Sequence, residues 1–132
     1  MGKNMIYETK AIYRIEYELI LFVKELREKK GISQRDLSIK MGFVETFVGK
    51  CESIDQPEKY NLRHLGILKN VFKLNSLDDF FPNGIPKNEQ IIIKYRKDHL
   101  LKMDGTISKV TENKIVDIIT VLGKTKAQNN KK

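Results

Sequence analysis

The first long stretch of the chain carries apolar residues at the three- and four-residue spacing of an amphipathic helix. This spacing predicts a helix with one continuous apolar stripe that ends near Lys30, where adjacent lysines complement the negative end of the helix dipole. Residues 4–10 show no clear periodicity and are expected to form an arm. The stripe consists of Ile12, Ile15, Leu19, Phe22 and Leu26.

Two shorter helices, joined by a glycine, are predicted directly after it. Ser33 can cap the first of them, and Leu37 and Met41 then lie one turn apart on a single face. Gly42 permits the sharp turn that a residue with a Cβ atom would resist. This arrangement is typical of the unit that places a helix in the major groove of DNA. The second helix has the apolar residues Phe43, Phe47 and Val48 and the outward residues Glu45, Thr46, Gly49, Lys50 and Ser53.

Beyond Pro82 and Pro86 the pattern changes to two runs rich in β-branched residues. These runs, residues 91–95 and 115–121, favour strands. A helix is the open alternative for residues 111–122, since that part of the chain also fits a short amphipathic helix capped by glycine. The residues of that alternative are Ile115, Ile118, Ile119, Leu122 and Gly123.

The dipeptide Asp104-Gly105 lies midway between the two runs. It is favoured in two-residue hairpin turns, because both central positions can adopt positive φ. An isolated hairpin is marginally stable in water, so its apolar side chains are expected to pack on the helices or on a second subunit. The turn predicts the cross-strand pairs Ile93 with Val116 and Lys97 with Glu112, and packing by Ile91, Ile93, Val116 and Ile118.

Charge is distributed unevenly along the 132 residues, which carry a formal net charge of +8. Residues 1–60 hold 11 Lys and Arg against 10 Asp and Glu, whereas residues 61–132 hold 14 against 7. Attraction to nucleic acid is therefore expected mainly from the second half. For any single lysine there, a role in keeping the surface soluble explains its presence equally well. The second half includes Lys94, Arg96, Lys97, Lys102 and Lys109.

Composition also argues for a cytoplasmic protein without a membrane partner. The sequence is 32% charged and 40% hydrophobic, and no apolar stretch approaches the roughly 18 to 20 residues of a membrane span. The N-terminus lacks the apolar core of a secretory signal. The single cysteine, Cys51, cannot form an internal disulfide and is interpreted as a small core residue.

No pattern in the sequence indicates catalysis. His64 and His99 are isolated, with no second His, Cys or carboxylate at metal-ligand spacing. No nucleophile signature accompanies them, and no glycine-rich phosphate loop occurs. The sequence therefore predicts no enzyme, no metal and no cofactor, and no small-molecule ligand is evident.

The run from Val23 through Glu52 resembles the helix-turn-helix of the Cro-like phage-repressor family, the xenobiotic-response-element class of bacterial regulators. The resemblance extends over residues 16–81, with a fourth helix capped by Asn61 and a closing short helix. Together with the β-branched runs it predicts a mainly α fold: a five-helix lambda-repressor-like DNA-binding domain over residues 12–82, a C-terminal β-hairpin extension over 87–123 and a disordered lysine-rich tail over 124–132. The last two helices of that domain are identified by Leu62, Leu65, Leu68, Phe72 and residues 74–81.

The resemblance also implies roles for single residues. Gln34 is expected to contact a phosphate together with the helix amides around it, and Arg27 is expected to pair with Glu52. Glu45 stands where the family commonly has an amide side chain; a carboxylate there repels phosphates but can accept a hydrogen bond from cytosine N4. The expected DNA-binding residues are Gln34, Val44, Glu45, Thr46, Gly49, Lys50 and Ser53.

Two functions are expected from these features. The first is a dimeric, sequence-specific DNA-binding transcriptional regulator, whose third helix enters the major groove of a palindromic operator with half-sites about one helical turn apart. Its partners are double-stranded DNA and a second copy of the chain. The alternative is a protein-interaction module, such as an antitoxin or adaptor, that uses the C-terminal extension and for which DNA binding is secondary. Glu45 and the nearly neutral first half of the chain support this alternative.

Overall fold

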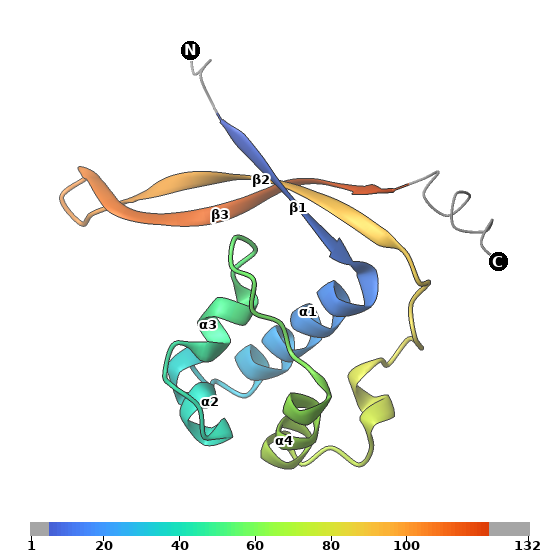
Figure 1. Cartoon of the computed structure of the whole chain (residues 1–132). Coiled ribbons are helices and arrows are strands. Elements are labelled where there is room, and N and C mark those ends of the chain that lie inside the picture. The colour runs from blue at the N-terminus through green and yellow to red at the C-terminus, as the bar shows by residue number, and fades with distance from the viewer. Residues whose placement is uncertain (1–5, 122–132) are drawn as a thin grey trace. The chain divides into compact units, whose positions relative to one another are not determined.

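The computed structural model describes residues 6–121 and divides the chain into two compact units. The helical unit is Tyr13–Asn88, and the sheet unit combines the residues before it with those after it. The tail expected at residues 124–132 lies outside the described residues. In chain order the elements are β1 (Tyr7–Tyr13), α1 (Arg14–Lys29), α2 (Gln34–Met41), α3 (Phe47–Glu52), α4 (Leu62–Phe72), the 3-10 helix η1 (Leu77–Phe80), β2 (Gln90–Leu101) and β3 (Ile107–Thr120) (Figure 1).

The predicted mainly α, five-helix class is wrong. The described residues form four α-helices, one 3-10 helix and a three-stranded sheet, which is an α+β composition. Residues 7–13, expected to be an arm and a helix start, form β1 instead. Their backbone groups are satisfied by pairing with the distant β2, and the local sequence gives no signal of that pairing. The closing helix is reduced to the four residues of η1.

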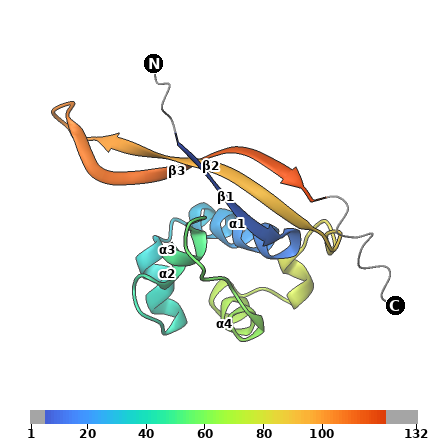
Figure 2. The ribbon, with the colours of Figure 1, turned by 45° about the horizontal axis from the view of Figure 1, so that its top comes forward.

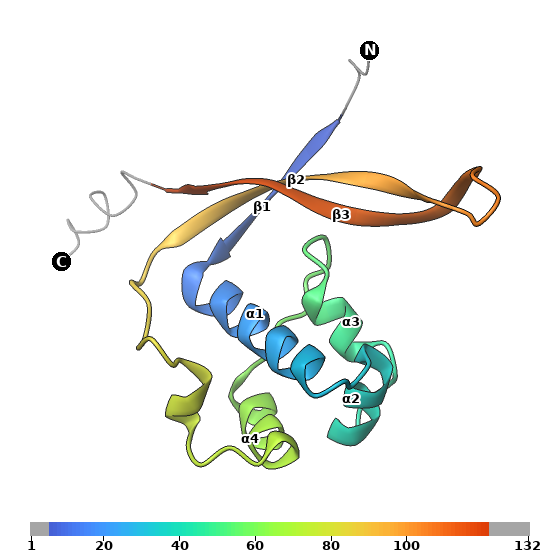
Figure 3. The same ribbon diagram turned by 180° about the vertical axis from the view of Figure 1, so that it is seen from behind.

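One residue from each of the five helical segments builds the centre of the helical unit. All five are at most 1% exposed, and they include Val23 of α1, which the predicted stripe omitted. Seen from behind, α1 runs alongside α3 (Figure 3). The short helix η1 contacts both α1 and α4. The predicted end of α1 is confirmed, since Lys30 is its C-cap. The central residues are Val23, Leu37, Val48, Leu68 and Phe80.

The sheet unit has the strand order β1-β2-β3, and its β2 and β3 form a long, twisted antiparallel hairpin (Figure 2). The predicted hairpin is therefore confirmed, and the helical alternative is wrong for residues 111–120; Leu122 and Gly123 lie outside the described residues. β1 is joined to β2 by side chains as well, because the Tyr95 hydroxyl donates to the Glu8 carboxylate over 3.2 Å.

The predicted hairpin register is wrong because the turn is longer than two residues. The Gly105 N–H donates to the Lys102 carbonyl over 2.9 Å, and the Lys102 N–H donates to the Thr106 carbonyl over 2.7 Å. Three residues, 103–105, therefore form the loop, with Gly105 at φ +89° in the left-handed position of such loops. Two further irregularities shift the pairing again. The observed pairs are Ile93 with Ile118 and Lys97 with Asn113.

Burial differs sharply between the two long strands. Ile91, Ile93 and Tyr95 of β2 are buried, each at most 3% exposed. Val116 and Ile118 of β3, which were expected to pack with them, are 44% and 41% exposed in the single chain. The apolar side chains of β3 thus remain largely accessible.

Candidate nucleic-acid interface

The α2-turn-α3 unit has the caps that the sequence predicts. The Ser33 hydroxyl accepts from the Asp36 N–H over 3.0 Å, and Gly42 ends α2 in the left-handed conformation with φ 87°. α3 begins later than expected, with Thr46 as its N-cap, and the Val44 carbonyl accepts from the Phe47 N–H. The residues just before α3 therefore lie in an exposed turn.

A buried serine joins α2 to α3. The Ser38 hydroxyl donates to the Gln34 carbonyl and accepts from the Val48 N–H, each over 2.9 Å, and Ser38 has no exposed surface. This contact fixes the start of α3 against α2. Sequence reasoning missed Ser38, although it adjoins Leu37 and precedes Met41 by three residues, on the inward side of α2.

The expected pairing of Arg27 with Glu52 is confirmed. Arg27 donates from Nε and one terminal nitrogen to the two Glu52 oxygens, each over 2.8 Å, and from its other nitrogen to the Ile32 carbonyl over 2.9 Å. The hydrogen bond to Glu52 raises the Arg27 pKa above its ordinary value. This two-point contact ties the end of α3 to α1, and removal of either partner would leave an uncompensated charge.

Gln34 is engaged within the protein. Its Nε2 donates to Glu52 over 2.8 Å, so it extends the Arg27 pair to α2. A Cβ atom at Gly49 would lie 3.1 Å from the Gln34 Oε1 atom, so the glycine accommodates this side chain. Because the amide nitrogen has two hydrogens, the expected phosphate contact is restricted to the second donor.

Glu45 has a cationic partner that sequence reasoning did not foresee. The Arg35 Nε atom donates to the Glu45 carboxylate over 2.9 Å, and both side chains are more than half exposed. Ten residues separate them, so no helical spacing signals the pair. The arginine offsets the negative charge that Glu45 would otherwise present to phosphates.

The seven predicted site residues are divided among three environments. Four are exposed on the turn before α3 or on its outer side, whereas Gln34, which is also exposed, lies beside the half-buried Gly49. Ser53 caps the end of α3, and its hydroxyl donates to the Asp55 carboxylate. The four residues on the turn or on the outer side of α3 are Val44, Glu45, Thr46 and Lys50.

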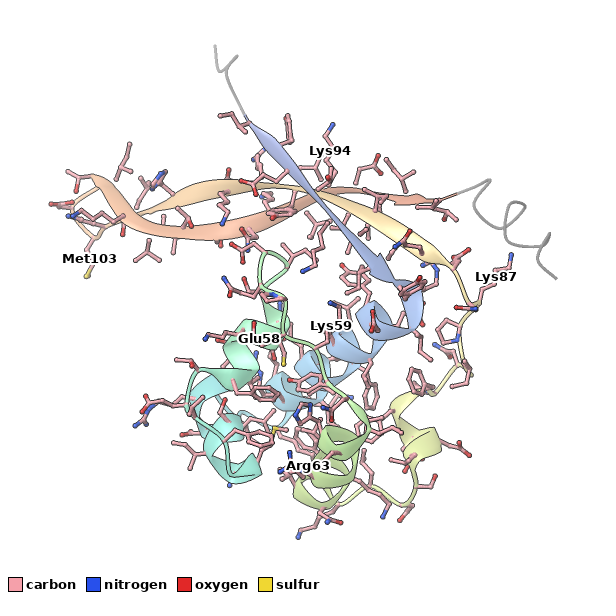
Figure 4. All side chains as sticks on the ribbon, viewed as in Figure 1. Glu58, Lys59, Arg63, Lys87, Lys94 and Met103 are labelled. Atoms are coloured by element: carbon pink, nitrogen blue, oxygen red, sulfur yellow. The ribbon has the colours of Figure 1, made fainter. Side chains whose placement is uncertain are left out.

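An aromatic cluster supports α3 from the opposite side. The His64 ring lies 4.8 Å from the Phe47 ring and 6.2 Å from the Tyr60 ring, measured between centroids. Its Nδ1 atom accepts from the Asn61 N–H over 2.9 Å and completes the N-terminal cap of α4. Burial and the neighbouring Arg63, labelled on α4 in Figure 4, lower the pKa of His64. The histidine that the sequence left isolated is thus a capping residue.

Cys51 is buried on α3, as predicted, and burial raises the pKa of its thiol to about 12. The part of the chain that the structure describes has no group of three or more His, Cys, Asp or Glu residues placed to hold a metal ion. Nor does any helix in that part have the length and apolar character needed to cross a membrane. No family model, no curated protein and no solved structure matches the chain.

Proposed function

We propose that the chain is a dimeric, sequence-specific DNA-binding transcriptional regulator that inserts α3 and the turn before it into the major groove of a palindromic operator. The supporting observation is the way in which α3 is held. Ser38 and the Arg27–Glu52 pair fix its inner side, while Val44, Thr46 and Lys50 are exposed. A rigidly held helix with small and polar outward residues suits close approach to base edges.

Each exposed residue has a chemistry that suits DNA. The Val44 side chain can contact a thymine methyl group, and the Thr46 hydroxyl can exchange hydrogen bonds with a base edge. Lys50 can bind either a phosphate or a guanine. The Glu45 carboxylate can accept a hydrogen bond from cytosine N4. In the absence of DNA, the Arg35 side chain pairs with this carboxylate. A cytoplasmic location is part of the same proposal.

A second candidate is a protein-interaction module, such as an antitoxin or adaptor, with DNA binding secondary. The observation that favours it is the accessible apolar surface of β3, where Ile107 is 69% and Val110 is 61% exposed. Exposed apolar side chains in such number are more typical of protein contacts than of phosphate contacts.

The salt dependence of binding to random duplex DNA distinguishes the two candidates. The regulator should lose affinity steeply with salt, with a log–log slope of about −0.9 for each phosphate neutralised. Lys50→Ala should reduce that slope by about one if Lys50 binds a phosphate. Lys24→Ala is the control, because it removes the same charge from an exposed position on α1. Absence of binding even at low salt would contradict the regulator and favour the interaction module.

If binding is found, selection of duplexes from a random pool with the purified full chain tests sequence specificity. The proposed regulator should enrich a sequence with two inverted half-sites about one helical turn apart. Enrichment of no common sequence would leave only nonspecific binding and would contradict the base-reading role of α3.

A further inference from the structure

The outer edge of the hairpin carries an unusual combination of length and apolar character. β3 is 14 residues long, and within residues 6–121 it pairs with β2 on one side and with no strand on the other. The strand contains no proline, and proteins usually protect such edges against pairing. The exposed apolar residues of β3 are Ile107, Val110, Ile115, Val116, Ile118 and Ile119, each at least 40% exposed.

Residues 111–115 form the longest regular stretch of this edge, and residues 117–120 form a shorter one. Residues 111–115 pair one-to-one with β2 from His99 to Tyr95, and the irregularities lie on either side. Outside this stretch the edge is partly satisfied by its own side chains, because the Val110 N–H donates to the Ser108 hydroxyl and the Ile118 N–H donates to the Asp117 carboxylate. A partner strand therefore finds its longest uninterrupted stretch of regular backbone at residues 111–115.

We propose that this stretch pairs antiparallel with the same stretch of a second copy, across a two-fold axis at Asn113. The pairing would extend two three-stranded sheets into one of about six strands. In this register Glu112 of each copy lies opposite Lys114 of the other, and opposite charges in directly facing positions stabilise a strand pair. Thr111 likewise faces Ile115. Residues 111–115 are thus self-complementary.

The charge of β3 argues for a second copy over a nucleic acid. The strand holds two lysines and two acidic residues, so it is neutral although the whole chain carries +8. A neutral strand does not attract phosphates, and two such strands do not repel each other. The exposed apolar side chains on either side of residues 111–115 would add hydrophobic stabilisation to the dimer, and this contribution does not depend on the charges. This contact would form the dimer of the proposed function, so the inference rests on that proposed function.

Sedimentation equilibrium of the full chain tests the contact. The natural sequence should associate to twice its 15.4 kDa mass. Glu112→Lys and Lys114→Glu each place like charges opposite one another twice, and each should raise the dimer dissociation constant by about tenfold. The double variant exchanges the two charges, restores the opposite pairs and should recover the original constant. Lys24→Glu makes the charge change of Lys114→Glu at an exposed position on α1 and should have no effect.

Hydrogen exchange supplies a second readout on the same samples. Amides of residues 111–115 should gain protection as protein concentration rises, and circular dichroism should show that every variant is folded. A monomeric natural chain would overturn the proposal, as would variants that associate normally or a double variant that does not recover. Half-site DNA binding by a monomer would support the DNA-binding role of α3 and contradict the dimer, whereas a dimer that does not bind DNA would support only this inference.

Discussion

At the scale of single residues, the candidate site is organised by buried polar contacts rather than by its exposed side chains. The Arg27–Glu52 pair was expected only from the resemblance to a family. Ser38 and the Arg35–Glu45 pair were not expected, since a serine beside apolar residues and two charges ten residues apart give no local signal. Of the two contacts that fix α3, the resemblance thus indicated the Arg27–Glu52 pair, whereas the Ser38 contact was found only in the structure.

Ser38→Ala should lower the free energy of unfolding by about 1 to 3 kcal/mol. The substitution leaves the buried Val48 N–H without its acceptor, and an unsatisfied buried donor costs about that much. Chemical denaturation measures the change. Thr46→Ala removes a hydroxyl that makes no capping bond at an exposed position, so it should stay within about 0.5 kcal/mol of the original protein. Equal losses in the two variants would contradict the structural role of Ser38.

Thr46→Ala should instead change sequence preference. If the Thr46 side chain contacts a base edge, its loss should weaken binding to the best operator by about 1 to 3 kcal/mol and relax selection at one or two positions. Binding to random DNA should hardly change. Competition titrations with both duplexes measure the difference, and an equal loss on both would exclude a base contact.

At the scale of elements, local signals predicted the ends of the helices but not the partners of the strands. Caps and glycines depend on neighbouring residues, so Ser33, Gly42 and Lys30 were placed correctly from the sequence. The hairpin register depends on loop length, and Asp104-Gly105 fits a two-residue turn as well as the observed three-residue loop. β1 has too little periodicity to be found without its partner strand.

Gly105→Ala should destabilise the hairpin, because φ +89° is unfavourable for a residue with a Cβ atom. The expected loss is about 1 kcal/mol, visible as faster hydrogen exchange in β2 and β3. Gly66→Ala is the matched control: this glycine lies within α4, is not among those with positive φ and has nothing within 4 Å of an added Cβ atom. It should stabilise the protein by about 0.4 to 1 kcal/mol, and the opposite signs distinguish backbone strain from a general effect of added bulk.

Acid should weaken the cap of α4. The pKa of His64 is lower in the folded protein than its ordinary value of 6.5, so the unfolded chain binds the proton more readily. The stabilisation is fully present above pH 6.5 and is lost as pH falls through 6.5 toward the folded pKa, since a protonated Nδ1 cannot accept the Asn61 N–H. Unfolding free energies from pH 7.5 to 5 should show this decline. His64→Gln keeps an acceptor that does not titrate and should flatten that part of the profile.

At the scale of the whole molecule, the two units differ in how they are assembled from the chain. The helical unit is continuous in sequence, whereas the sheet unit takes strands from both sides of it. Patterns within short windows therefore recovered most of the helices of the helical unit. They could not assign β1 to a sheet whose next strand begins more than seventy residues later.

A fragment of residues 13–88 should fold on its own. It contains all five central apolar residues of the helical unit and the contacts that fix α3, including both partners of the Arg27–Glu52 pair. Cooperative thermal unfolding followed by circular dichroism tests this expectation. The fragment should also be monomeric at concentrations at which the full chain associates. A non-cooperative transition would show that the sheet is needed for the helices to fold.

The discontinuous origin of the sheet has a consequence for synthesis on the ribosome. β1 is translated first, but β2 and β3 emerge only after the whole helical unit, so the first strand has no native neighbour while α1 to α4 are made. Contacts between residues so distant in sequence form late and slow folding, whereas the local contacts of helices form early. We therefore expect two kinetic phases in refolding: a fast one for the helices, and a slower one that completes the sheet.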